Sequence, residues 1–137
     1  MNRWMSLDVG SKTIGVAITD PLKITVRPLT TLARTTISRD AQSICELMET
    51  QEVDKLIVGM PKHLDGRRSA TLDFIEPLVE HLDTVSMIPI EWAEERLSTK
   101  RAEELMAETG LSLAERRKKR NEYSAAVILQ WYLEESR

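Results

Sequence analysis

Carboxylates at two separate places in the sequence could bind metal ions, and the first of them is Asp8. It stands in the otherwise apolar segment Trp4–Val9 and is followed by Val9 and Gly10. An unpaired carboxylate is costly to bury. Asp8 therefore either reaches solvent or pairs with Lys12 or Arg96, or it is held rigidly in a sheet to bind a cation. In the last case, Lys12 would sit beside the anion that the cation attracts.

The second acidic cluster consists of Glu91, Glu94 and Glu95, with Arg96 directly adjacent. It could be the solvated start of a helix, since acidic residues favour the first helical turn. If Glu94 or Glu95 instead converges on Asp8, the carboxylate oxygens suit Mg²⁺ or Mn²⁺. Two such ions could bind a scissile phosphate, activate the attacking water and stabilise the leaving oxygen. That arrangement predicts hydrolysis of phosphodiester bonds.

A run of five basic residues precedes the last predicted helix: Arg116, Arg117, Lys118, Lys119 and Arg120. The chain has a formal net charge of −3, and subtracting these five positive charges leaves −8. Such a run is often only a solvated surface. Here it would also let a polyanion approach an acidic protein, through phosphate contacts that do not read its sequence. We therefore expect a nucleic-acid partner.

The composition indicates one globular domain over residues 1–137, with 42% hydrophobic and 30% charged residues. Its apolar stretches are far shorter than the roughly 20 residues that a membrane-spanning helix needs. The acidic Asp8 comes before any signal-peptide core could form. We therefore expect a cytoplasmic protein with no membrane partner. The single cysteine, Cys45, excludes an internal disulfide and a multi-cysteine zinc site.

The spacing of apolar residues predicts three strands at the start of the chain. Trp4–Val9 alternates, Thr13–Thr19 is rich in β-branched residues, and a tight turn joins the two. Ile24–Leu32 contains Pro28, which a strand tolerates at the edge of a sheet.

Helices and strands then alternate. Helical spacing after a cap at Ser38 predicts a first helix through Ala41 and Met48. We expect Pro77 to kink or shorten the next helix. The later elements predicted in this way are a strand at Val53–Met60, a helix from Leu72 to Leu82, a strand at Met87–Trp92, and helices from about Ser98 to Glu108 and from about Asn121 to Glu134.

This order of elements predicts an α/β fold. Three antiparallel strands followed by strands that return through crossover helices give a mixed sheet with helices on both faces. In such sheets, reactive groups gather at the strand ends, near the place where the strand order reverses. The candidate acidic residues should meet there.

Four segments in this order resemble the YqgF/RuvX family of Holliday junction resolvase-like nucleases, within the ribonuclease H-like superfamily. They are Leu7–Ala17, Ile57–Pro61 with Asp65–Gly66, Glu94–Thr99 and Ser124–Leu133. The resemblance implies a ribonuclease H-like, five-stranded mixed sheet in the order 3-2-1-4-5, flanked by helices on both faces. It also implies a metal-dependent nuclease that acts in maturation of the 16S rRNA 5′ end or on Holliday junctions, which are branched DNA.

The resemblance further implies the site residues. Asp8 matches the family's first-strand metal ligand. Glu95 matches the acidic residue of an Asp-Glu-Arg motif, which here reads Glu94, Glu95 and Arg96. The family's third carboxylate falls on Asn121. Asp8, Glu95 and Asn121 would thus be the catalytic residues and would hold two ions, Mg²⁺ or Mn²⁺. The supporting residues would be Glu94, Arg96, Lys12 and Glu122. Nucleic acid would bind through Lys12 and the five residues of the basic run.

Asn121 departs from the family pattern, because an amide offers a neutral oxygen ligand but no charge. Affinity for the cation should fall, and hydrolysis with it. Three explanations are open. The residue could be a deliberate replacement of aspartate, a natural variant in which Glu122 takes over, or the mark of a binding protein that has lost catalysis.

Two other classes of function fit parts of the sequence. One is a non-catalytic module that binds structured nucleic acid through the basic run. The other is an ATP-handling protein of the actin/hexokinase type, because Asp8–Gly10 before a hairpin is similar to its phosphate-binding motif. A chain of 137 residues leaves no room for that fold's second lobe.

The expected partner is precursor rRNA or branched DNA. If it is precursor rRNA, ribosomal particles are a further expected partner. Phosphate contacts and metal chemistry are common to RNA and DNA, so they do not distinguish the two. Monomer and homodimer are both open, although a four-arm junction has two equivalent scissile strands and would favour a dimer.

Overall fold

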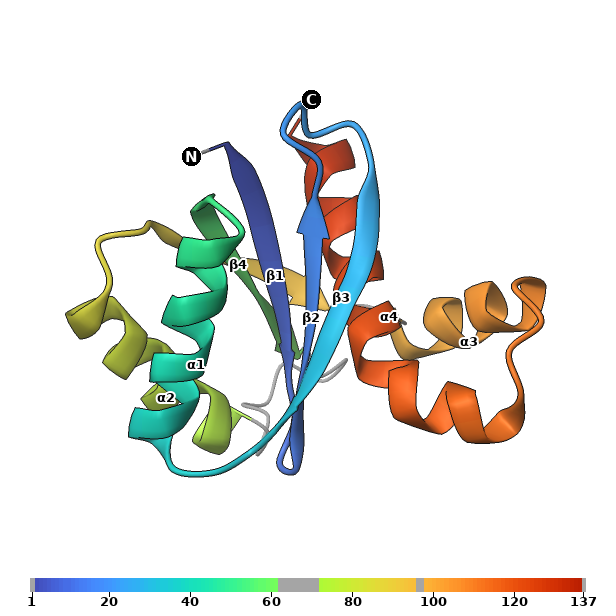
Figure 1. Cartoon of the computed structure of the whole chain (residues 1–137), viewed down its shortest axis with the longest axis horizontal. Helices are drawn as coiled ribbons and strands as arrows, with labels where there is room; N and C mark the ends of the chain where they lie inside the picture. The colour runs from blue at the N-terminus through green and yellow to red at the C-terminus, as the bar shows by residue number, and fades with distance from the viewer. Residues whose placement is uncertain (1, 62–71, 96–97, 137) are drawn as a thin grey trace.

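The computed structural model describes residues 2–61, 72–95 and 98–136, without the side chains of Glu95, Ser98 and Thr99. Within these residues, one mixed sheet has the strand order β3-β2-β1-β4-β5, and helices cover both of its faces (Figure 1). The predicted fold class is confirmed. The strands are β1 (Arg3–Val9), β2 (Thr13–Thr19), β3 (Val26–Ala33), β4 (Val53–Pro61) and β5 (Ile90–Glu95). The helices are α1 (Ile37–Thr50), α2 (Leu72–Val85), α3 (Ser98–Glu108) and α4 (Leu113–Glu135).

The pairing of the strands brings distant parts of the chain to one end of the sheet. β2 runs antiparallel to both β1 and β3, whereas β4 runs parallel to both β1 and β5. The carboxyl ends of β1, β4 and β5 therefore lie together, next to the hairpin that joins β1 to β2. β3 forms one edge of the sheet, as predicted from Pro28.

One face of the sheet is covered by α1 and α2 (Figure 1). Its core is a single cluster of large apolar side chains, in which Met5 and Leu7 of β1 meet Ile44 of α1 and Leu78 of α2. These side chains are fully buried. Met5 and Leu7 both belong to this cluster because side chains two residues apart in a strand point to the same face.

The opposite face is covered by α4. Ala17 of β2 and Ile57 of β4 pack there against Ala125, Ile128 and Leu129. α3 lies against α4, and α3 together with the first part of α4 projects from the side of the sheet (Figure 1). We call α3 together with residues 113–120 of α4 the helical arm.

Besides the start of the last helix, three features of the predicted elements differ from the structure for identifiable reasons. The cap of α1 is Thr36, whose hydroxyl accepts a hydrogen bond from the backbone N–H of Arg39 at 3.2 Å, and not Ser38. β5 begins at Ile90 rather than Met87, because the chain turns at residues 86–89 and the Met87 side chain is 99% exposed. α2 continues through Pro77 to Val85, so this proline does not shorten the helix.

The start of α4 is the largest correction. The helix begins at Leu113, eight residues before the predicted start at Asn121. A capping box fixes this start: the Ser112 hydroxyl accepts from the N–H of Glu115 at 3.2 Å, and the Glu115 carboxylate accepts from the N–H of Ser112 at 3.1 Å. Arginine and lysine are also good helix formers. The basic run therefore lies within α4 and is not a loop that precedes it.

In the part of the chain that the structure describes, no helix combines the length and the apolar character that a membrane crossing requires.

Candidate active site

Asp8 lies on the face of the sheet that α4 covers. Side chains alternate along β1, so Ser6 and Asp8 share one face while Leu7 faces α1 and α2. The fully buried Ser6 hydroxyl donates a hydrogen bond of 2.6 Å to the backbone carbonyl of Ala125 in α4. Asp8 is the next residue of this row towards the hairpin, and it is half-buried.

Gly15 brings α4 to the level of Asp8. It is the β2 partner of Asp8, and side chains of paired residues share a face. A Cβ placed on Gly15 would lie 2.0 Å from the backbone oxygen of Asn121 and 2.7 Å from the backbone nitrogen of Glu122. The backbone of α4 thus rests directly on β2 at this point. Only glycine leaves room for this contact, and it sets Asn121 beside the row that contains Asp8.

The Asn121 side chain points towards the hairpin. Its amide nitrogen donates to the hydroxyl of Thr13, the first residue of β2. Thr13 precedes Gly15 by two residues and so lies on the same face. The structure therefore brings position 121 to the end of the sheet where Asp8 stands, as expected. With the amide nitrogen engaged, the amide oxygen is the atom of Asn121 that can accept from another group or bind a cation.

Glu122 occupies a different place. Burial raises the pKa of its carboxyl group, against the opposing effects of the positive Lys119 and of the Thr31 hydroxyl. Thr31 belongs to β3 and is the partner of Gly15 on the side away from Asp8. The Glu122 carboxylate therefore lies over β3, with β2 between it and Asp8. This geometry does not favour Glu122 as the substitute for the missing aspartate.

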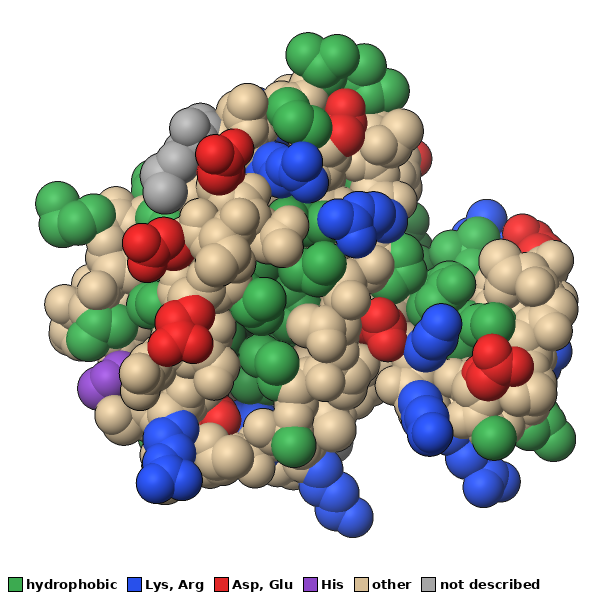
Figure 2. Space-filling view, in the orientation of Figure 1, with side chains coloured by type: hydrophobic (Ala, Val, Ile, Leu, Met, Phe, Trp, Pro, Cys, Tyr) green, Lys and Arg blue, Asp and Glu red, His purple; other side chains and the backbone are tan. Residues whose placement is uncertain are grey.

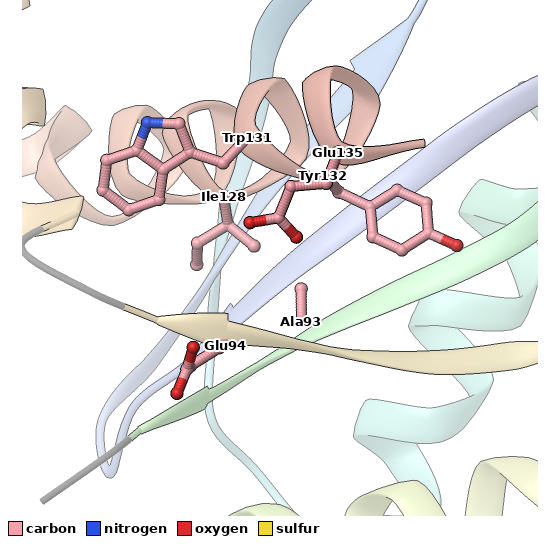
Figure 3. Close-up of a pocket in the computed structure, with 6 residues that line it drawn as sticks. All are labelled: Ala93, Glu94, Ile128, Trp131, Tyr132 and Glu135. Carbon is pink, nitrogen blue, oxygen red and sulfur yellow. The ribbon is translucent and has the colours of Figure 1, made fainter. Parts of the chain in front are cut away.

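Glu94 and Glu95 end β5, opposite Met60 and Pro61 of β4. A cavity of about 300 Å³ separates this strand from α4. Figure 3 shows Ala93 pointing towards α4 and the Glu94 carboxylate pointing away from it. The structure thus does not bring Glu94 towards Asp8. The side chain of Glu95 and the whole of Arg96 lie outside the described residues. Among the side chains that are described, no three His, Cys, Asp or Glu residues are grouped closely enough to hold a metal ion.

The hairpin between β1 and β2 carries Lys12, which is exposed at the same end of the sheet as Asp8. The hairpin is held from the side by Arg34, a residue that sequence reasoning missed. Its guanidinium donates to the backbone carbonyl of Gly10 at 2.9 Å and to the carboxylate of Asp40 at 2.8 Å. Gly15 was missed as well, although a glycine among β-branched strand residues is a signal of close backbone approach.

The five basic residues do not form one cationic surface. Successive residues of a helix point about 100° apart, so a run of five is distributed around the axis. Arg116 donates to the backbone carbonyl of Leu111 at 3.0 Å, and Arg120 forms an ion pair of 2.5 Å with Glu103 of α3. Both therefore hold the arm together. The exposed remainder is Arg117, Lys118 and Lys119. Figure 2 shows basic side chains over the arm and along the lower end of the molecule.

Comparison with known proteins agrees with this architecture. Residues 2–135 match the family described as RuvX, Holliday junction resolvase. A proposed pre-16S rRNA nuclease of Desulforamulus reducens is 40% identical over 136 residues, which cover 96% of each chain. One of Moorella thermoacetica is 36% identical over 132 residues, covering 96% of this chain and 94% of the relative.

Solved structures with the same fold include two resolvases. RuvC of Thermus thermophilus in complex with a Holliday junction substrate superimposes with a TM-score of 0.62 and 13% identity, covering 98% of this chain and 96% of RuvC. The fowlpox virus resolvase with Holliday junction DNA gives a TM-score of 0.63 and 12% identity, covering 98% of both chains. At this level of identity the likeness concerns the fold.

Proposed function

We propose, because the chain belongs to the RuvX family of Holliday junction resolvases, that it is a nuclease that hydrolyses phosphodiester bonds with the help of divalent metal ions. The observation that carries this proposal is the contact between Gly15 and the backbone of Asn121. Asp8 is the strand partner of Gly15. The contact therefore supports a site in which Asp8 and position 121 serve the same metal centre.

Asp8, Glu95 and Asn121 are the residues that we propose to hold Mg²⁺ or Mn²⁺. All three offer oxygen donors, which these hard cations prefer. Glu95 is proposed over Glu94 because it matches the acidic residue of the family's motif, whereas the Glu94 carboxylate points away from α4 (Figure 3). Two bound ions would polarise the phosphate and lower the pKa of the attacking water. Asn121 brings no charge, so we expect weaker cation binding than an aspartate would give.

The chain's own cations would hold the substrate. Lys12 is exposed on the hairpin beside Asp8, where it can bind a phosphate oxygen close to the bond that is cut. We propose that Arg96 supports Glu95 in the same region. Further away, Arg117, Lys118 and Lys119 would bind phosphates along the strand, whereas Arg116 and Arg120 keep their structural contacts in the arm.

The salt dependence of binding tests the role of the arm. Each phosphate contact contributes a slope of about 0.7 to 0.9 to the fall of log affinity with log salt concentration. Replacing Arg117, Lys118 and Lys119 by glutamine should therefore reduce the slope by roughly 2 to 3. Arg39→Gln, an exposed change on α1 across the sheet, is the matched control and should leave the slope as it is. Equal slopes in all proteins would remove the arm from the proposed interface.

As the substrate we propose precursor 16S rRNA, because the relatives described above are proposed pre-16S rRNA nucleases. Ribosomal particles are then the expected partner and the cytoplasm the expected location. Branched DNA is the alternative substrate. It would call for a homodimer with one site for each of the two equivalent strands, whereas a monomer suffices for trimming rRNA. Labelled precursor rRNA and a synthetic four-way junction, cleaved side by side, distinguish these substrates.

Four variants test the chemistry in the presence of Mn²⁺. Asn121→Asp should raise the cleavage rate, because it restores a charged ligand at position 121. Asp8→Asn and Glu95→Gln should each lower the rate of that improved protein by at least about 100-fold, since loss of a group that only supports a metal ligand already costs about 10- to 100-fold. Glu122→Gln is the control and should leave the rate close to that of its parent. Undiminished cleavage in Asp8→Asn would refute the proposed site.

A non-catalytic nucleic-acid-binding protein is the second candidate, and the amide of Asn121 is the observation that favours it. Such a protein would bind the same substrates with the same salt dependence. It would cleave neither of them, with any divalent metal, and Asn121→Asp would not change this.

A further inference from the structure

We propose that Arg34 is a positioning residue of the candidate active site: it fixes the β1–β2 hairpin, and with it Asp8, against the layer formed by α1 and α2. This inference rests on the proposed function. Arg34 follows β3 directly and lies 24 residues from its hairpin partner Gly10. Gly10 comes two residues after Asp8, so a bond to its carbonyl acts on the end of the strand that carries the carboxylate.

The guanidinium of Arg34 connects three segments of the chain. It donates to Gly10 of the hairpin at 2.9 Å, to the Asp40 carboxylate of α1 at 2.8 Å, and to the backbone carbonyl of Phe74 in α2 at 3.4 Å. A planar fork with five N–H donors can serve all three at once, whereas the ammonium group of lysine is a single point charge. The arrangement thus depends on arginine specifically.

The burial of this group points to a role beyond stability. The side chains of Arg34 and Asp40 are 12% and 3% exposed. Asp40 also accepts from the backbone N–H of Thr35 at 2.9 Å and from its hydroxyl at 2.8 Å. A buried ion pair is a poor source of stability compared with apolar residues of the same size, and its best-attested use is to select one arrangement. Here the arrangement selected is the position of the β1–β2 hairpin relative to α1.

The hairpin is held between the two helical layers. On one side, the carbonyl of Lys12 accepts from the backbone N–H of Arg34 at 2.8 Å, in addition to the bond at Gly10. On the other side, Thr13 accepts from the amide of Asn121 in α4. The N–H of Gly10 donates to the carbonyl of Thr13 at 2.8 Å and closes the turn. Replacing the Arg34 side chain leaves the backbone bond to Lys12 in place but removes the bond to the Gly10 carbonyl, which is the one nearest Asp8. A shift of about 1 Å in a reacting group can lower a rate about 100-fold.

The test replaces the ion pair without leaving a buried charge. In the Asn121→Asp protein, the double change Arg34→Met with Asp40→Leu substitutes apolar side chains for both partners, which buried pairs commonly tolerate. We expect the double variant to fold. Its affinity for Mn²⁺, measured by electron paramagnetic resonance, and its cleavage rate should fall on the order of 10- to 100-fold. Hydrogen exchange at the Gly10 amide should become faster.

Two further variants distinguish a specific effect of Arg34 on the hairpin from a general loss of stability. Arg34→Lys keeps the charge beside Asp40 but not the bond to Gly10, so it should also weaken Mn²⁺ binding and speed exchange at Gly10. Asp20→Asn is the control. Asp20 accepts from the N–H groups of Ile24 and Thr25 at 2.7 and 2.8 Å in the turn at the other end of β2. Its loss should leave both measurements unchanged.

The outcomes distinguish the two proposals. If the folded double variant keeps the Mn²⁺ affinity and the Gly10 exchange rate of its parent, Arg34 does not position the site and this inference is overturned. If the Asn121→Asp parent binds no Mn²⁺ and cleaves neither substrate, the proposed function fails. Exchange at Gly10 then still decides whether Arg34 holds the hairpin.

Discussion

The two faces of the sheet are built differently, although both belong to the same strands. On the face towards α1 and α2, large side chains such as Met5, Leu7 and Ile44 fill the space between sheet and helices. On the face towards α4, Ser6 and Gly15 let the helix backbone come down onto the strands. The candidate active site lies on the second face. A helix held by backbone contact has little freedom to shift, which suits a face that must place ligands accurately.

The same difference between the faces accounts for the place of the candidate site at one end of the α4 face. Away from the hairpin, Ile57 and Leu129 give the α4 face an apolar core of its own. Towards the hairpin this core ends, and Asp8, Thr13 and Asn121 take the corresponding positions. The apolar part anchors α4, and the polar end presents the groups that could do chemistry.

The largest expected effect comes from Gly15→Ala, because its new Cβ would meet the backbone of α4 at 2.0 Å and cannot be relieved by a side-chain movement. We expect a loss of about 3 kcal/mol or more in the free energy of unfolding, measured with urea. Gly10→Ala is the matched control in the same hairpin. Its Cβ would lie 3.1 Å from the Thr13 oxygen, which asks for a shift of only a few tenths of an ångström. The loss should therefore be no more than about 1 kcal/mol, the low end of the cost of overpacking, and the lower entropy of alanine in the unfolded chain offsets part of it. If Gly15→Ala and Gly10→Ala lost the same unfolding free energy, the close contact between β2 and the α4 backbone would be contradicted.

Substitutions of the adjacent residues Ser6 and Leu7 should have intermediate effects on stability, and they compare the two faces directly. Leu7→Ala removes a fully buried side chain from the α1/α2 face and should cost about 3 kcal/mol of unfolding free energy. Ser6→Ala removes only one hydrogen bond on the α4 face and should cost about 1 kcal/mol. A reversal of this order would mean that the α4 face depends on side-chain packing as the other face does.

The smallest effect concerns Glu122 and the pH. Because burial raises its pKa above the ordinary 4.5 in the folded protein, the folded state favours the protonated form. The associated stability is present below the unfolded-state pKa and is lost as the pH rises through the folded-state pKa. Glu122→Gln should therefore gain about 0.5 kcal/mol relative to the wild type at pH 7, and less at pH 4. A gain that is the same at both pH values would exclude this cause.

Much of the fold and part of the candidate site could be predicted from the sequence. The hairpin Trp4–Thr19 and the helices and strands that alternate after it were predicted from the local spacing of apolar residues. The strand order came from the family resemblance. Asp8 was singled out because an unpaired carboxylate in an apolar strand is costly to bury. Position 121 followed from aligning the last helix, and the structure brings it to the same end of the sheet.

The remaining features depend on contacts that no local pattern reveals. The basic run was placed before the last helix, because the helical spacing of apolar residues begins only after Asn121, whereas the capping box of Ser112 and Glu115 starts the helix before the run. The start of β5 is set by pairing with β4 and not by the apolar run at Met87. Arg34 meets Gly10 and Phe74 only once the sheet and both helices of that layer have assembled.

The bond between Ser6 and Ala125 joins residues that are 119 positions apart. A chain is synthesised from its N-terminus, and domains fold as their segments emerge. The α1/α2 face can thus be completed while α4 is still being made, and the groups at Asp8 stay unassembled until nearly all of the described chain has been translated. Contacts of such long sequence separation also form slowly, so activity should appear later in refolding than most of the secondary structure.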